Sequence, residues 1–203
     1  MPVAVTEIPV HPLPLVPPRK RWTRGDLAQL ETSGLFNQER VELIEGELIS
    51  KMGKNRPHVD TATLLFLWLV QVFGPRFVNQ EAPIDVHPED NPTNQPEPDL
   101  IVLKRSFSKF RSATPQPDDL ALVVEVSDTS LSYDLSVKAP LYARAGIAEY
   151  WILDIQARHI LVHRAPQSGK YTSVIAFNEH ESVAPLAAPA SEFPVRDAFA
   201  PEG

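Results

Sequence analysis

Two acidic residues and one lysine are the residues of this chain whose types and spacing suggest a chemistry. Asp99 begins the apolar run 100–103, Glu125 lies near the end of the apolar run 120–126, and Lys138 follows on the next segment. Carboxylates at the ends of neighbouring strands can hold a divalent cation, because hard cations prefer oxygen ligands. A lysine beside such a cation can stabilise the negative charge that develops when a phosphodiester is attacked.

Each of these residues also has an ordinary structural explanation. Asp99 follows a proline and could be a turn residue, whereas Glu125 could be a solvent-exposed residue at the end of a sheet strand. Glu125 is the sharper case, because it interrupts an apolar strand where a buried charge needs a partner. On an expected helix, Asp134 could form a salt bridge with Lys138 or could orient its ammonium toward the metal. Taken together the residues favour a metal site, with the backbone carbonyl of Val126 as another ligand.

Further candidates lie outside this first group. Glu42 shares one face of a short strand with an apolar residue, so it could reach into the site or flank a sheet edge. His58 follows a proline at an expected helix start and could have a structural role or contact a phosphate. Lys104 and Arg105 begin a loop with basic and aromatic residues, which could follow a phosphate backbone or could simply be solvated.

Length and composition exclude several classes of protein. The 203 residues, 43% hydrophobic and 22% charged, suit one domain with a sizeable core. The absence of cysteine excludes disulfides, thiolate zinc sites and cysteine nucleophiles, and fits a cytoplasmic protein. The net charge of −7 counts against a protein that coats nucleic acid through bulk charge. No signal peptide is visible, and the longest apolar run, 64–70, is much shorter than the roughly 20 residues that span a bilayer.

The order of apolar runs and turn residues predicts a mixed α/β (α+β) domain. We expect the apolar helix to be well buried, because it is apolar nearly all round. The expected elements are a helix capped by Thr23 and ending at Ser33, a hairpin over 40–50, an apolar helix over 58–73, a strand over 77–86, buried strands over 99–103 and 121–126, a helix over 132–145 in which Pro140 can introduce a kink, and strands over 149–154, 159–164 and 171–177.

Proline divides the chain into three parts. Residues 1–20 form a Pro-rich arm, residues 21–180 the folded domain and residues 181–203 a tail rich in proline and alanine. The tail is either loose or packs back along the domain through Phe193 and Val195. We therefore expect one domain between two proline-rich ends.

Several short motifs of the chain occur together in a characteristic order. They are Val41-Glu42-Leu43-Ile44-Glu45-Gly46-Glu47-Leu48, Pro98-Asp99-Leu100, Val124-Glu125-Val126-Ser127-Asp128-Thr129, Tyr133-Asp134, Lys138, Tyr142-Ala143-Arg144-Ala145-Gly146-Ile147 and Glu149-Tyr150-Trp151-Ile152-Leu153-Asp154. In these motifs the chain resembles the Uma-two family of restriction endonucleases, within the PD-(D/E)xK nuclease superfamily. The resemblance extends from about Arg21 to Tyr171 and is most specific from Val124 to Asp154.

The resemblance implies a restriction-endonuclease-like fold, a mixed β-sheet flanked by helices with an N-terminal β-hairpin. It implies Mg²⁺ (or Mn²⁺) at one sheet edge, bound by Asp99 and Glu125, with Glu42 completing the acidic cluster and Lys138 as the catalytic lysine. The implied function is a Mg²⁺-dependent endonuclease that hydrolyses DNA. A homodimer is expected, because cutting two strands requires two sites.

Two positions depart from the family pattern. The Glu-x-Lys motif of the superfamily would place a lysine at Ser127, so its role must pass to Lys138 on the next helix. Leu135 stands where family members often have arginine. Ser127 and the acidic net charge favour an alternative, a non-catalytic module of nuclease fold that binds nucleic acid or a protein partner. A hydrolase of small phosphoesters is a third hypothesis.

Overall fold

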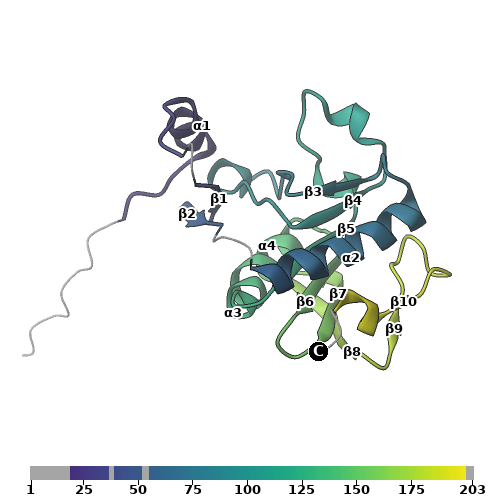
Figure 1. Cartoon of the computed structure of the whole chain (residues 1–203). Helices are drawn as coiled ribbons and strands as arrows, with labels where there is room; N and C mark the ends of the chain where they lie inside the picture. The colour runs from purple at the N-terminus through teal and green to yellow at the C-terminus, as the bar shows by residue number, and fades with distance from the viewer. Residues whose placement is uncertain (1–18, 37–38, 52–54, 200–203) are drawn as a thin grey trace, which may run out of the picture.

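The computed structural model describes residues 19–36, 39–51 and 55–199, and a six-stranded mixed sheet organises them (Figure 1). Most of the Pro-rich arm lies outside the described residues. The strands lie in chain order across the sheet, and β5 and β6 are the parallel pair. They are β3 (Val78–Gln80), β4 (Leu100–Leu103), β5 (Leu120–Ser127), β6 (Glu149–Asp154), β7 (His159–Gln167) and β8 (Lys170–Asn178). The predicted mixed sheet flanked by helices is confirmed.

The remaining elements largely follow the sequence pattern. Thr23 caps α1 by accepting the N–H of Asp26, as its position predicted. The elements are α1 (Arg24–Thr32), the hairpin β1 (Val41–Ile44) and β2 (Glu47–Ser50), α2 (Arg56–Phe73), α3 (Leu131–Tyr133), the π-helical turn η4 (Asp134–Lys138), α4 (Ala139–Arg144), the short pair β9 (Ser182–Val183) and β10 (Phe193–Pro194), and the 3₁₀ turns η1 (Asn91–Thr93), η2 (Phe107–Phe110), η3 (Pro117–Asp119) and η5 (Val195–Ala198).

The strand expected over 77–86 is much shorter in the structure. It ends after Gln80, because Glu81 adopts a positive φ of 49° and a proline follows at position 83. Ile84 and Val86 are nevertheless fully buried. The apolar pattern therefore identified core positions correctly but did not identify their backbone conformation.

Two apolar layers cover the two faces of the sheet. Helix α2 and the C-terminal segment pack on one face, where Leu65, Trp151 and Phe193 belong to one buried cluster. Helix α4 packs on the other face with Tyr142 and Ile152 in a second cluster. The side chains of β5 alternate between these layers, so an acid on β5 points to only one of them.

Helix α2 is buried along one stripe only, so the expectation that this apolar helix is well buried is wrong. Leu65 and Leu69 are fully buried, whereas Leu67 is 58% and Val59 40% exposed. A helix that lies on a single sheet face can bury only the side chains that point to that sheet. None of the helices in the described ranges has the length and apolar character needed to cross a membrane.

The C-terminal segment 182–199 packs against the domain. Phe193 lies 4.9 Å from the ring of Trp68 on α2, and Phe199 is also buried. The fully buried carboxylate of Glu149 accepts hydrogen bonds from Arg164 at 2.6 Å and from the N–H of Leu186 at 2.7 Å. Of the two alternatives for the tail, the structure shows the packed one as far as Phe199.

One interrupted helix connects the parallel strands β5 and β6. It runs from Leu131 to Arg144, but residues 134–138 form a wider π-helical turn between α3 and α4. Pro140 follows that turn and cannot donate a backbone hydrogen bond to it, which favours a local irregularity. The expected kink is therefore a π-helical turn, and Lys138 lies at its end.

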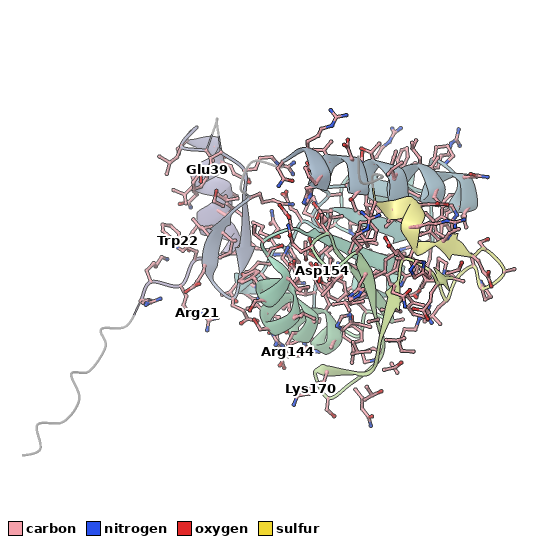
Figure 2. All side chains as sticks on the ribbon, turned by 60° about the horizontal axis from the view of Figure 1, so that its bottom comes forward. Arg21, Trp22, Glu39, Arg144, Asp154 and Lys170 are labelled. Carbon is pink, nitrogen blue, oxygen red and sulfur yellow. The ribbon has the colours of Figure 1, made fainter. Side chains whose placement is uncertain are left out.

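The hairpin β1–β2 is attached to the domain by contacts at its turn. The N–H of Trp22 donates to the carbonyl of Gly46 at 2.8 Å, and Gly46 adopts a positive φ of 75° against the side chain of Arg21. Arg144 of α4 forms an ion pair with Glu45 at the same turn. Figure 2 labels Arg21 and Trp22 near the hairpin and Arg144 at α4. These contacts attach the hairpin to the segment before α1 and to α4.

Candidate active site

The antiparallel register of β4 and β5 brings two of the predicted acids together. Leu100 pairs with Val124, so Asp99 lies opposite Glu125 at the rim of the sheet. Both side chains are buried, with exposed fractions of 5% and 4%. Asp99 Oδ2 accepts the N–H of Val126 at 2.8 Å. The pairing inferred from the two apolar runs is thus present in the structure.

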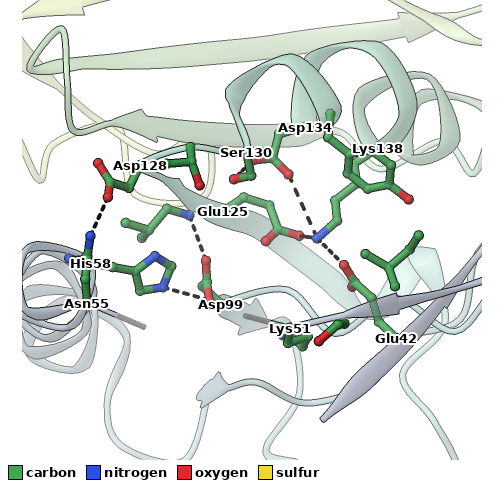
Figure 3. A pocket seen from close by; sticks show the side chains of 15 residues that line it. Glu42, Lys51, Asn55, His58, Asp99, Glu125, Asp128, Ser130, Asp134 and Lys138 are labelled. Carbon is green, nitrogen blue, oxygen red and sulfur yellow. Dashed lines mark hydrogen bonds and ion pairs between the residues drawn. The ribbon is translucent and has the colours of Figure 1, made fainter. Parts of the chain in front are cut away.

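Lys138 lies between acids that come from three different elements (Figure 3). Its Nζ is 2.8 Å from Glu42 Oε1 on β1 and 2.9 Å from Glu125 Oε1 on β5. Asp134, one turn earlier on the same helix, has Oδ1 3.9 Å away. Both explanations of Lys138 are therefore present, the i,i+4 pair with Asp134 and the position inside the acidic cluster. Glu42 points into the cluster and does not flank an edge.

Ser127, where the resemblance led us to expect a lysine, forms hydrogen bonds within the cluster. Its Oγ donates to Asp134 Oδ2 at 2.5 Å, and Ser130 Oγ donates to the same oxygen at 2.7 Å. The two hydroxyls hold Asp134 with its other oxygen toward Lys138. A small side chain at position 127 thus helps to fix the helix that carries the lysine.

Burial and mutual repulsion dominate the electrostatics of this cluster. Burial raises the pKa of Glu125, and the charges of Asp99, Asp134 and Glu42 raise it further, whereas Lys138 opposes the shift. Burial likewise raises the pKa of Asp134, against the effect of Lys138. Burial alone would lower the pKa of Lys138, but Glu125, Glu42 and Asp134 outweigh it, so the pKa is raised and the ammonium stays charged.

The N-terminus of α2 borders the same site. His58 Nε2 lies 3.3 Å from Asp99 Oδ1, and the N–H of His58 donates to the capping side chain of Asn55 at 3.0 Å. The amide of Asn55 also donates to Asp128, in the loop after β5. His58 therefore lies in the first turn of α2, as expected for a structural role, and also beside Asp99, a predicted metal ligand (Figure 3).

These side chains line one pocket of about 330 Å³. The pocket is rich in acidic groups, because Asp99 lines it together with Glu42, Glu125 and Asp134, whose carboxylates face the ammonium of Lys138. Its lining consists of Glu42, Ile49, Ser50, Lys51, Asn55, His58, Asp99, Glu125, Val126, Asp128, Thr129, Ser130, Tyr133, Asp134 and Lys138. All four predicted catalytic residues lie in this pocket, and so do Val126 and His58.

The donor set of the pocket fits a magnesium ion. Within the described ranges, no group of three or more histidine, aspartate or glutamate side chains is arranged to hold a metal ion. Mg²⁺, however, is usually held by one or two carboxylates together with waters and substrate phosphate. Asp99 and Glu125 would supply two carboxylates, and Val126, which also lines the pocket, would supply its backbone carbonyl.

The two basic candidates lie elsewhere. Lys104 and Arg105 follow the end of β4, whereas Asp99 precedes its start, and Arg105 forms an ion pair with Asp119. Their role in DNA binding stays a prediction.

Sequence reasoning missed Tyr142, whose hydroxyl donates to Glu125 Oε1 at 3.0 Å. Its position four residues after Lys138, on the same helix face, was the available signal.

Comparisons with known proteins identify the family to which the chain belongs. The sequence pattern of the Uma2 family, described as "Putative restriction endonuclease", matches residues 25–196. The fold is similar to the crystal structure of a protein from Anabaena variabilis described as "a putative nuclease belonging to DUF820", with a TM-score of 0.58, 17% sequence identity and coverage of 78% of this chain and 89% of that one. No curated protein matches the chain. Since the family pattern spans the hairpin, the sheet and the whole pocket, the chain belongs to the Uma2 family.

Proposed function

We propose that this protein is a Mg²⁺-dependent endonuclease that hydrolyses phosphodiester bonds of DNA in the cytoplasm. The observation that supports the proposal is that Glu42 and Glu125 both contact the buried ammonium of Lys138, while Asp99 lies opposite Glu125 on the neighbouring strand. Membership of a family described as restriction endonucleases supports DNA as the substrate.

In the proposed reaction, a water oxygen forms a bond to phosphorus while the bond from phosphorus to the leaving oxygen breaks. The water gives up a proton to solvent, the leaving oxygen takes up a proton from solvent, and the products are a phosphate monoester and a hydroxyl. Lys138 acts through its charge, because its raised pKa keeps the ammonium protonated. Its ammonium stabilises the negative charge that grows on the phosphoryl oxygens.

The other residues of the pocket hold this arrangement. Glu42 fixes the ammonium from the hairpin side at 2.8 Å, and Asp134 orients it from its own helix. Asp99 and Glu125, with the carbonyl of Val126, are the residues that would hold Mg²⁺. When bound, Mg²⁺ supplies Lewis-acid polarisation of the phosphate and lowers the pKa of an attacking water.

A direct test is the cleavage of plasmid and single-stranded DNA in the presence of Mg²⁺ or Mn²⁺. We expect the wild type to cleave and Asp99→Asn, Glu125→Gln and Lys138→Met each to lose at least about 100-fold in rate, as removal of a group that stabilises transition-state charge does. Asp197→Asn is the matched control, because its side chain is exposed and lies outside the pocket lining. Equal rates in the wild type and the three pocket variants would refute the proposal.

Two further measurements separate the proposal from its rivals. Calorimetry that detects no binding of Mg²⁺ or Mn²⁺ by the wild type would favour the non-catalytic module. Hydrolysis of nucleotides but not of DNA would favour the small-phosphoester hydrolase. Cutting of both DNA strands requires two sites, so we also propose a homodimer, which sedimentation of the full chain tests.

A further inference from the structure

Tyr142 is the buried side chain that contacts the proposed metal site without lining the pocket. It lies on α4, has no exposed surface, and packs edge-on against the ring of Tyr150 with centroids 5.0 Å apart. A ring enclosed in this way has little freedom to move. The position of its hydroxyl is therefore set by the core and not by the pocket.

The hydroxyl of Tyr142 and the ammonium of Lys138 donate to the same carboxylate oxygen. Glu125 Oε1 accepts Tyr142 at 3.0 Å and Lys138 at 2.9 Å, and no donor from the described residues contacts Oε2. Two donors on one oxygen fix the rotation of the carboxylate about its terminal bond. Oε2 is thereby left as the oxygen that a cation can use.

A neutral donor has a specific advantage at this position. The ammonium of Lys138 is already shared with Glu42 and faces Asp134. A second cation beside Glu125 would cancel the negative charge that attracts a metal, whereas a phenol holds the carboxylate without adding charge. Tyr142 can thus order Glu125 while preserving the acidity of the pocket.

We propose that Tyr142 is a positioning residue that orients Glu125 for metal binding through the hydrogen bond from its hydroxyl to Oε1. This inference rests on the proposed function, since it names a further residue of the same site. Tyr142 does not touch substrate in this scheme, and its effect reaches the metal through Glu125.

The structure offers a matched pair of variants to test it. Tyr142→Phe removes the hydroxyl that holds Glu125. Tyr150→Phe removes a neighbouring buried hydroxyl that has no hydrogen-bond partner in the described part of the chain. Both changes keep the aromatic ring and delete one buried oxygen. Thermal unfolding of both variants measures any shared loss of packing.

We expect Tyr142→Phe to weaken binding of Mn²⁺, measured by calorimetry on the full chain, by about tenfold, the order expected when a charged group loses a hydrogen bond. Cleavage of DNA should lose a similar factor in kcat with little change in KM, because the substrate contacts are intact. Crystals grown without metal should show the Glu125 carboxylate rotated away from its wild-type orientation. Tyr150→Phe should match the wild type in all three measurements.

The outcomes distinguish this inference from the proposed function. If the wild type cleaves DNA and Tyr142→Phe matches it in Mn²⁺ affinity, kcat and Glu125 orientation, the inference is wrong and the function stands. If the wild type neither binds Mn²⁺ nor cleaves DNA, the proposed function fails. The Glu125 orientation in the two metal-free crystals then decides the inference alone, and an unchanged carboxylate overturns it.

Discussion

Replacement of Lys138 by methionine tests how much the buried ammonium contributes to the stability of this fold. Methionine has a similar length and fills the same space, so the change removes charge and hydrogen bonds with little loss of volume. Lys138 is 4% exposed, and its ammonium lies within 2.9 Å of both Glu42 and Glu125. After the substitution these carboxylates and that of Asp134 remain buried without their cation.

The expected cost follows from that burial. Removing one partner of a buried ion pair costs about 3 to 5 kcal/mol, whereas an exposed pair is worth about 1 kcal/mol or less. Because Lys138 serves three carboxylates that are each less than 5% exposed, we expect a value within the higher range. The additional substitution Glu125→Gln should recover part of this loss, since it replaces a buried carboxyl that has lost its ammonium partner with a neutral amide.

Urea unfolding at pH 7 in the presence of EDTA measures these free energies without any contribution from metal. Lys138→Met should lower the midpoint strongly, and the double variant Lys138→Met/Glu125→Gln should lie between it and the wild type. A loss below about 1 kcal/mol for Lys138→Met would show that the cluster behaves like a surface pair, and would contradict the cost expected for a buried one. A double variant less stable than Lys138→Met would contradict the assigned repulsion.

Two other predictions concern the rest of the domain. Burial lowers the pKa of His163, so the unfolded chain binds more protons than the folded chain and stability should fall as the pH drops below about 6.5. Between pH 8 and pH 5 the urea midpoint of the wild type should therefore fall more than that of His163→Phe. The same pH dependence in both proteins would contradict this prediction. Arg164→Ala should cost about 3 kcal/mol, because it leaves the fully buried Glu149 without its cation and releases the C-terminal segment to proteases. Arg144→Ala, which removes half-exposed pairs, should cost less than about 1 kcal/mol, and equal losses would contradict this difference.

The local sequence pattern predicted much of the fold. Short-range signals sufficed for the cap at Thr23, the hairpin and the central strand around Glu125, because turn residues, capping residues and apolar periodicity act within a few residues. The same signals overextended the strand after Phe77 and overestimated the burial of α2. Whether an apolar residue such as Leu67 is covered depends on which distant element packs over it, and periodicity carries no such information.

For the candidate site, the sequence specifies which groups are available: two acids at the ends of apolar runs, and a lysine on the helix that follows. Their contacts with one another depend on the tertiary structure. The register of β4 against β5 sets Asp99 beside Glu125, and the placement of the hairpin brings Glu42 to Lys138. Likewise, only packing of α4 on the sheet brings the Tyr142 hydroxyl to the same carboxylate. The physical reason is that these contacts join side chains from separate elements, whose relative positions are fixed by core packing and not by local sequence.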